Sequence, residues 1–300
     1  MTVRRDGTRL AAPGIGDNAQ GVAALLALTR AMDAARITTS SDILFVANVG
    51  EEGSGGLRGV RHLFGEGRYK DRIAAFISID GTGRGDYVTT GGVGSRRYRV
   101  TFSGPGGHSY SAFGLVNPAN ALAGAIQRLG AVSVPSSPRT TFNVGMIGGG
   151  TSVNTIPASV WMDVDLRSES PAELARLDDA FKAAVARAVD EENRARSTAE
   201  GPVGAELDLT GERPSGQTAQ STALVQAATG AMRALGQQPV YGSSSTDSNL
   251  PMSLGIPAIT IDTGIRGDRA HAPDEWIDVE RTSTISGLQR VLLLVLTVAG

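Results

Sequence analysis

The chain has 300 residues, 41% of them hydrophobic, and carries 28 basic against 30 acidic side chains for a net charge of −2. This composition suits a globular protein, and the balanced charge gives no reason to expect nucleic acid or a membrane surface as a partner. Cysteine is absent, which excludes disulfides and thiolate metal sites, so a bound metal must use carboxylates and the histidines.

The N-terminal region carries no targeting signal that we can identify. It lacks the apolar stretch of a signal peptide, and the last apolar run, at 291–298, is too short to span a membrane. We therefore expect a cytoplasmic protein. Residues 1–16 predict a strand fragment and a loop. A helical pattern follows Asp17, which is well placed to cap that helix.

Two apolar runs predict neighbouring strands in the next segment. The run at 43–49 predicts a fully buried strand, and a helix is expected over 54–64. A second apolar run at 73–79 ends at Asp80. Strand, helix and strand at this spacing imply parallel pairing with a right-handed crossover.

The pattern changes after the glycines at 91–94, which we interpret as a hinge. Strands are expected at 97–103, 140–147, 159–167 and 205–209, and helices at 118–129 and 171–193. The order strand, helix, strand, strand, helix, strand is typical of a split βαβ sandwich with one open sheet face. An insertion of this length is a domain in its own right.

The α/β pattern returns in the last part of the chain. A helix is predicted over 222–235, a short buried strand over 256–261 and a final helix over 279–298. The predicted fold class is therefore α/β, with an inserted α+β domain. The predicted boundaries are 1–92 and 212–300 for the α/β domain and 93–211 for the insertion.

Several acidic side chains and one imidazole are expected to lie near one another in this predicted fold. Glu51 and Glu52 follow one strand, Asp80 follows the next, Asp17 precedes the first helix, and His271 lies beyond the strand at 256–261. Parallel strands bring these positions to one rim of the sheet. Each also has a structural interpretation: helix cap, solvated acidic turn, strand end or surface loop. Together they predict a metal site with ligands that suit Zn²⁺, Mn²⁺ or Co²⁺.

Six short segments resemble, in the same order, motifs of the two-metal aminoacylase, carboxypeptidase G and peptidase T family. The resemblance covers nearly the whole chain, and six motifs in order are far more specific than any one of them. The segments are 16–25, 51–56, 80–81, 104–109, 151–157 and 271–275.

The resemblance implies a catalytic domain that binds two metal ions, zinc in the first place, and an inserted lid that dimerises. Asp17 would bridge the two ions, Glu52 and His271 would complete one site, and Asp80 would serve the other. Glu51 would be the general base for a metal-bound water. The implied activity is hydrolysis of amide or peptide bonds in small peptides or N-acyl amino acids.

The same resemblance implies roles for three residues outside the metal site. His108 would reach the partner subunit's site and stabilise the oxyanion, and Asn154 would help to hold the substrate or the oxyanion. Arg213 would grip a substrate carboxylate. Their structural alternatives are a surface histidine in a glycine loop, a turn cap and a structural arginine.

One departure from the family pattern concerns the second metal. The family carries its first metal-binding histidine in a His-x-Asp motif on an early strand, whereas the first histidine here is His62, which we expect on the surface. We therefore expect a chain that starts late relative to its family. The alternative to an active hydrolase is an impaired or non-catalytic relative that keeps the fold and dimerises. A nucleotide-binding α/β protein is disfavoured because no glycine-rich phosphate loop follows the first strand.

Overall fold

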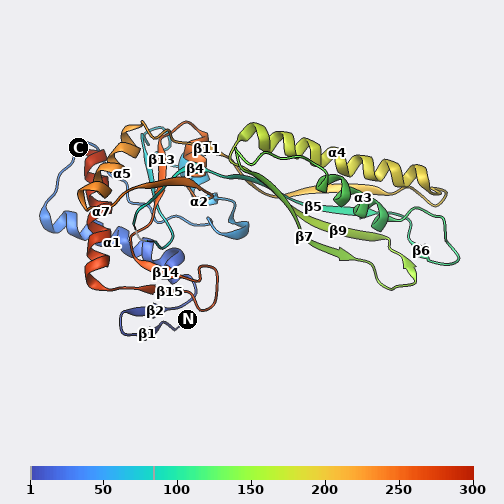
Figure 1. The fold of residues 1–300 in the computed structure, drawn as a ribbon, viewed down its shortest axis with the longest axis horizontal. Helices are drawn as coiled ribbons and strands as arrows, with labels where there is room; N and C mark the ends of the chain where they lie inside the picture. The colour runs from blue at the N-terminus through green and yellow to red at the C-terminus, as the bar shows by residue number, and fades with distance from the viewer. Residues whose placement is uncertain (1, 84) are drawn as a thin grey trace. The chain divides into compact units, whose positions relative to one another are not determined.

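The computed structural model describes residues 2–83 and 85–300, with the exception of the side chain of Ser54. The chain forms two units (Figure 1). The first unit comprises Met1–Gly92 and Gly216–Gly300, and the second comprises Val93–Ser215. The return to the first unit thus comes slightly later than the predicted boundary at 211/212. Each unit is described by itself below.

The first unit is built on a mixed five-stranded sheet. Four strands follow the order β11, β4, β13, β3, and the fifth, β12, pairs with β4. β13 runs parallel to β3 and antiparallel to β4. The strands are β3 (Phe76–Ile79), β4 (Tyr87–Gly92), β11 (Gly216–Gln217), β12 (Val240–Ser244) and β13 (Ala258–Ile261).

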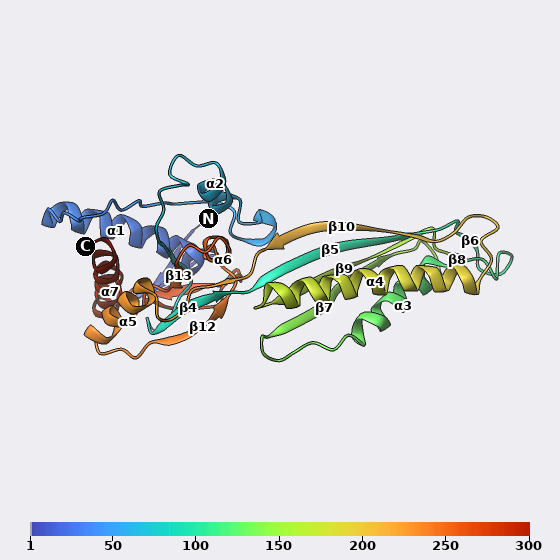
Figure 2. The same ribbon diagram turned by 90° about the horizontal axis from the view of Figure 1, so that it is seen from above.

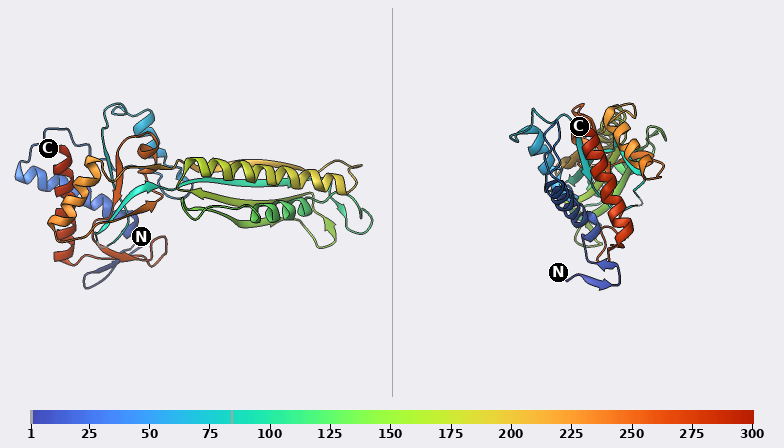
Figure 3. Two further views of the ribbon diagram at one scale, coloured as in Figure 1. Left: turned by 45° about the horizontal axis from the view of Figure 1, so that its top comes forward. Right: turned by 90° about the vertical axis from the view of Figure 1, so that its left-hand side faces the viewer.

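Helices cover the two faces of this sheet. The larger apolar cluster joins Leu28 of α1, Val225 of α5 and Leu294 of α7 to Ile259 of β13, and α1 and α7 are seen at the outside of the unit (Figure 3). The smaller cluster contains Leu57 and residues of α2 and α6. The helices are α1 (Gln20–Ala35), α2 (Arg58–Gly65), α5 (Ala223–Ala234), α6 (Asn249–Ser253) and α7 (Arg281–Ala299).

A small antiparallel sheet accompanies the N-terminal segment of the first unit, with the strand order β1, β2, β15, β14. A short π-helix, η1 (Ile15–Ala19), then leads into α1, and a 3₁₀ turn, η2 (Gly53–Gly55), precedes α2. The four strands are β1 (Arg4–Asp6), β2 (Arg9–Ala11), β14 (Arg266–Asp268) and β15 (Trp276–Asp278).

The predicted buried strand at 43–49 is wrong for this structure. In the part of the chain that the structure describes, this segment belongs to no sheet, and it is drawn as a plain trace between α1 and α2 (Figure 2). Leu44 and Val49 are exposed. The predicted crossover from this segment to β3 is therefore also wrong. A strand needs a neighbour to satisfy its backbone groups, and a cavity of about 1160 Å³ lies between the segment and β3.

The second unit carries a fully antiparallel sheet in the order β10, β5, β9, β7. Alternate residues such as Tyr98, Val100 and Phe102 are buried, and they form one cluster with residues of both helices, including Phe181. The elements are β5 (Gly94–Ser103), α3 (Pro118–Gly130), β7 (Thr140–Gly149), β9 (Ser159–Ser168), α4 (Pro171–Ala195) and β10 (Gly204–Arg213). The sequence predicted each of these elements in order.

The opposite face of this sheet is polar. Arg99 donates to both carboxylate oxygens of Asp163, at 2.8 and 2.7 Å. Arg97 and Arg167 flank Asp165 in the same way. No helix from the described residues is needed to cover such a surface, since its side chains pair with one another across neighbouring strands.

One helix of the described chain, α7, is long and apolar enough to cross a membrane by length and composition alone, with a mean hydropathy of 1.4 in its best window. Core helices of soluble proteins pass the same test. Val291 and Leu294 of α7 are fully buried in the cluster that covers the first unit's sheet. The helix begins at Arg281, slightly later than predicted.

Candidate metal centre

Asp17 lies in η1, in a loop that is held by one buried carboxylate. Glu275 accepts hydrogen bonds from the backbone N–H groups of Gly14 at 2.7 Å, Gly16 at 2.9 Å and Asp17 at 2.6 Å. Glu275 is only 2% exposed. A carboxylate with three amide donors is a strong, directional anchor. The backbone of Asp17 is therefore fixed by a residue that lies far away in the chain.

The predicted role of Asp17 as a helix cap is wrong. The residue preceding α1 is Ala19, and no side chain caps this helix end. The neighbouring Asn18 instead ties the loop to the sheet, because its side-chain amide donates to the carbonyl of Ile79 at 2.7 Å and its carbonyl accepts from Gly21 N–H at 3.1 Å. The carboxylate of Asp17 is left to face the strand ends.

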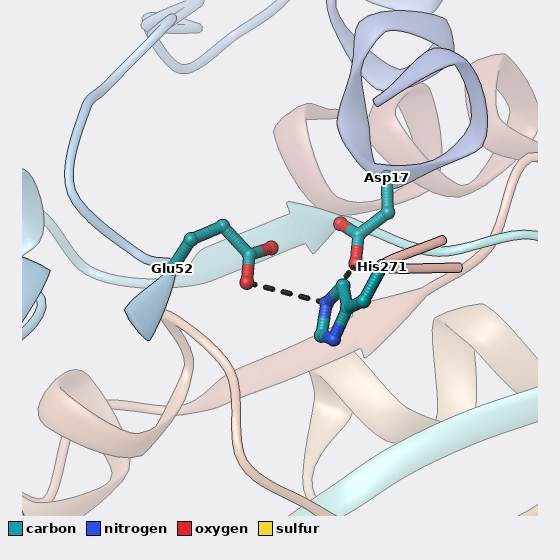
Figure 4. Close-up of side chains that lie close together, drawn as sticks. All are labelled: Asp17, Glu52 and His271. Atoms are coloured by element: carbon teal, nitrogen blue, oxygen red, sulfur yellow. Dashed lines mark hydrogen bonds and ion pairs between the residues drawn. The ribbon is translucent and has the colours of Figure 1, made fainter. Parts of the chain in front are cut away.

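Three side chains from separate segments converge at this point (Figure 4). The Nε2 atom of His271 lies 2.9 Å from Asp17 Oδ2 and 3.3 Å from Glu52 Oε2. One ligand atom from each of the three residues lies within 4.8 Å of the others. The turn that carries His271 is unusual, since this residue has a φ of +64°. Such a conformation is uncommon for a residue with a side chain and is often found at functional sites.

The electrostatics of this site favour a cation. Burial, followed by the negative charges of Asp17 and Glu51, raises the pKa of Asp80 from 3.8 to about 7. Burial and the charge of Asp17 also raise the pKa of Glu52. The pKa of His271 is raised as well, mainly by the charge of Glu52. Carboxylates crowded in this way resist ionisation until a positive charge arrives.

The donor set of these residues fits a transition metal. Two carboxylate oxygens and one imidazole nitrogen that surround a zinc ion at about 2.0–2.2 Å lie within a few ångströms of one another, as the side chains of Asp17, Glu52 and His271 do here. Three protein ligands leave one position open, which is typical of a catalytic site. Asp80 lies close enough to Asp17 for the negative charge of Asp17 to raise its pKa.

Glu51 lies beside this group without joining the cluster of three. It lines the same cavity as Asp80 and Glu52, and its charge contributes to the raised pKa of Asp80. The two adjacent glutamates thus differ in their neighbours, since Glu52 lies 3.3 Å from His271, whereas the charge of Glu51 acts on Asp80. His62 is exposed and lies 3.5 Å from Glu66 within α2, as expected for a surface residue.

The second unit brings two further predicted residues together. His108 lies in β6 (Gly107–His108), which pairs with β8 (Thr155–Ile156), and the carbonyl of Asn154 accepts from Ser109 N–H at 3.0 Å. His108 Nδ1 accepts from Tyr110 N–H at 3.2 Å. Both His108 and Asn154 are exposed. Arg213, by contrast, is buried at the end of β10, opposite Ser95.

Sequence reasoning missed two contributors to the metal centre. Glu275 belongs to one of the six motifs, but the sequence indicated no separate role for it. Its position four residues after His271 was the one feature that could have indicated a place near the site. Asp247 was read as part of a polar loop, but it accepts from the side chain of Asn48 at 2.7 Å and its charge adds to the raised pKa of Asp80. Neither contact could be inferred from local spacing, because the partners lie far apart in the chain.

A mixed α/β sheet with Asp80 at the end of β3, and with Asp17, Glu52 and His271 converging from three separate segments, defines a candidate metallohydrolase. Residues 1–294 match peptidase family M20/M25/M40, and the chain belongs to this family. It is by family a hydrolase that acts as a peptidase. The family resemblance in the six sequence motifs is thereby confirmed. No curated protein matches the sequence at a significant level.

Solved structures share the fold at low sequence identity. The aminopeptidase PepT of Bacillus cereus superimposes with a TM-score of 0.80 at 21% identity, over 100% of this chain and 76% of its own. A tripeptidase of Staphylococcus aureus gives 0.77 at 20% identity, over 100% and 77%. The YXEP protein of Bacillus subtilis, described as a dinuclear metal-binding peptidase, gives 0.68 at 16% identity, over 93% and 71%. The predicted α/β fold class is confirmed by this likeness.

Proposed function

We propose that this chain is a metal-dependent hydrolase that cleaves amide or peptide bonds in small peptides or N-acyl amino acids. The observation that carries the proposal is the convergence of Asp17, Glu52 and His271 within 4.8 Å. The descriptions of similar structures as an aminopeptidase and a tripeptidase support a small-peptide substrate. Zinc is the proposed metal, and manganese and cobalt suit the same ligands.

Residues of the chain divide the chemistry between them in this proposal. A bound metal would acidify a water molecule and polarise the scissile carbonyl. Glu51 accepts the proton of the attacking water and delivers it to the leaving amine, which requires it to stay free of metal. Asp17, Glu52 and His271 would hold the ion.

The second metal position is weaker on the same reasoning. Within the described residues it is served by Asp17 and Asp80, both carboxylates, whereas a catalytic zinc normally has about three protein ligands. We therefore expect close to one tightly bound metal per chain and low activity. This shortage also favours the second candidate function, an impaired relative that keeps the fold and the dimer.

The test of the proposed function separates the two glutamates. Glu51→Gln should lower turnover by about 10²–10⁴-fold and leave metal content intact, because only proton transfer is lost. Glu52→Gln should lower metal occupancy. Metal analysis of both purified variants, together with a peptidase assay, checks this division. Equal metal loss in the two variants would contradict the roles that we assign.

The second unit is proposed to be a lid that dimerises and supplies His108 to the partner's site. Asn154 is proposed to help hold the substrate or the oxyanion, and Arg213 is a weaker candidate for gripping a substrate carboxylate. β7 ends its sheet within the described chain, and Met146 and Ile147 on it are exposed. Such an edge is a ready surface for a second copy.

Subunit mixing tests this proposal. In an active form of the protein, Glu51→Gln and His108→Ala are each expected to be inactive, while a mixture of the two regains part of the activity through heterodimers. Unmixed samples of each variant serve as controls. No recovery after subunit exchange would count against action of His108 between subunits.

A further inference from the structure

Two side-chain amides hold the backbone on either side of Asp80. The amide of Asn18 donates to the carbonyl of Ile79 at 2.7 Å, and the amide of Gln20 donates to the carbonyl of Gly81 at 2.5 Å. These two carbonyls belong to the residues directly before and after Asp80. We call the pair of side chains, Asn18 and Gln20, the amide clamp. The backbone that carries the carboxylate of Asp80 is thus held on both sides.

Gln20 occupies an unusual position for its residue type. It is the first residue of α1 and is only 3% exposed, whereas glutamine is mostly found at protein surfaces. Its Oε1 atom accepts a hydrogen bond from the hydroxyl of Thr263, which is fully buried. Thr263 follows β13, the strand that pairs with β3. One amide therefore joins the start of α1 to the chain that leaves each of two neighbouring strands.

The start of α1 approaches the end of β3 too closely for a side chain at Gly21. A Cβ atom there would lie 2.7 Å from the carbonyl oxygen of Ile79 and would also clash with the side chain of Asn18. Gly21 lies inside α1, so close packing rather than an unusual backbone conformation requires glycine here. The separation between α1 and the end of β3 is therefore limited in one direction by this contact and in the other by the amide clamp.

A different contact holds Asp17 near His271. Glu275, four residues after His271 in the chain, accepts hydrogen bonds from three backbone N–H groups of the loop that carries Asp17. The amide clamp instead joins the segment after Asp17 to the backbone around Asp80. One set of hydrogen bonds thus places Asp17 relative to His271, and a separate set places it relative to Asp80.

We propose that Asn18 and Gln20 are positioning residues, which hold Asp80 at the separation from Asp17 that a divalent cation between the two carboxylates requires. Like charges at this distance repel each other, so backbone contacts have to hold the carboxylates together until the cation binds. Contacts that orient metal ligands typically change metal affinity by about 10–100-fold. The inference rests on the proposed metal centre but not on hydrolysis, so its tests measure metal binding and amide exchange.

Cobalt titration of the metal-free chain, followed by the visible absorption of the bound ion, tests the amide clamp. Gln20→Met keeps the length of the side chain but removes the donor to Gly81. We expect the second, weaker equivalent of cobalt to bind at least about tenfold more weakly than in the parent chain, while the affinity for the first changes by less than about threefold.

The titration separates failure of the inference from failure of the proposed function. Equal weakening of both equivalents in Gln20→Met, or an unchanged second equivalent, would overturn the inference alone. A parent chain that takes up one equivalent and no second at saturating cobalt would also overturn it, because the amide clamp would then prepare no metal position. A parent chain that binds no cobalt would overturn the inference and the proposed function together.

Amide hydrogen exchange of the metal-free protein tests the same contacts without a metal. The N–H groups of Asp80 and Gly83 make backbone hydrogen bonds of 3.0 and 3.1 Å. In Gln20→Met these two amides should exchange about tenfold faster or more, because the loop that contains them has lost its tie to α1. The amide of Gly16, which Glu275 holds, should keep its rate. Unchanged exchange at Asp80 and Gly83 would contradict the proposed clamp.

Thr218→Val is the matched control. The hydroxyl of Thr218 donates to the carbonyl of Ala258 at 2.6 Å, at the first residue of β13, whereas Asp80 contacts the last residue of that strand. The control therefore also breaks a buried hydrogen bond between a side chain and a carbonyl. It should lower the melting temperature by a similar amount, but leave both cobalt affinities and the exchange at Asp80 unchanged. A similar loss of the second equivalent in Thr218→Val would attribute the effect to general destabilisation and overturn the proposal.

A milder variant covers the case in which Gln20→Met does not fold. Gln20→Asn keeps an amide, but its side chain is shorter by one methylene group and cannot reach both Gly81 and Thr263. We expect the same weakening of the second cobalt equivalent and the same faster exchange at Asp80. Parental values in both measurements would overturn the proposal.

Discussion

The sheets of the two units differ in how completely their strands are paired. In the second unit β5 has a neighbour on each side along its full length, with β10 and β9 in continuous register apart from one irregularity in β10. In the first unit β3 has four residues, pairs on one side and borders a cavity on the other. The antiparallel sheet is complete within its own segment of chain, whereas the mixed sheet depends on strands that come from far apart. The first unit should therefore be the less stable of the two around its open edge.

A pair of phenylalanine truncations measures this difference. Phe181 is fully buried in the cluster of the second unit, and the half-buried Phe45 lines the cavity between segment 43–49 and β3. Phe181→Ala should lower the free energy of unfolding of the second unit by about 3–5 kcal/mol, because a cavity remains in a packed core. Phe45→Ala should cost about 1 kcal/mol, because its surroundings are already open. Urea denaturation followed by hydrogen exchange of each unit gives both values, and similar costs would show that the edge is as well packed as the core.

The sequence predicts the second unit, with its fully paired sheet, better than it predicts the sheet of the first unit. The alternation over 97–103 and the capped helix starting at Pro118 determine local structure by themselves, and the predicted elements of the second unit are confirmed. The run at 43–49 has the composition of a buried strand, but a strand also requires a partner on its edge, and composition carries no information about that partner. The prediction was wrong for this reason.

The candidate site shows the same limit at the level of side chains. The residue types and their expected place at one rim of the sheet predicted that Asp17, Glu52 and His271 would lie together. The structure brings them within 4.8 Å of one another, although the strand predicted before Glu52 does not form. The support of the site was not predictable, because Glu275 and Asp17 are joined by a contact between a buried carboxylate and a loop 258 positions away. The residue types do not indicate which side chain accepts a hydrogen bond from a given backbone N–H group, so this acceptor is found only in the structure.

Replacement of Glu275 tests how strongly this support matters. Glu275→Gln keeps the shape of the side chain but loses the charge that holds three N–H groups, so we expect a loss of about 1–3 kcal/mol in the free energy of unfolding. Metal affinity should fall with it, since Asp17 moves with the loop. The matched control is Asp274→Asn, which changes an exposed carboxylate paired with Arg269 and should alter stability by less than about 1 kcal/mol. A Glu275→Gln variant with unchanged stability and metal affinity would show that the loop is held by other contacts.

Once the metal is removed, the stability of the first unit should depend on pH, because its crowded carboxylates repel one another when they ionise. The pKa of Asp80 is raised from 3.8 to about 7 in the folded protein, and those of Glu52 and His271 are also raised. A group with a raised folded pKa contributes stability that is fully present below its unfolded pKa and is lost as the pH rises through its folded pKa. The chelated protein should therefore lose stability as the pH rises, with most of the change from Asp80 completed just above pH 7, and bound metal should remove this loss.

Two asparagine variants identify the group responsible. Asp80→Asn cannot ionise, so the melting temperature of its chelated form should depend less on pH between about 5 and 8. Asp163→Asn in the second unit is the control, because the hydrogen bond from Arg99 lowers the pKa of Asp163, and stability from such a group is lost only as the pH falls below that range. Differential scanning calorimetry at several pH values, with chelator and then with added zinc, measures the slopes. The slope of melting temperature against pH could instead be the same in Asp80→Asn as in the parent protein. The pH dependence would then come from other groups, and the raised pKa of Asp80 would not couple metal binding to stability.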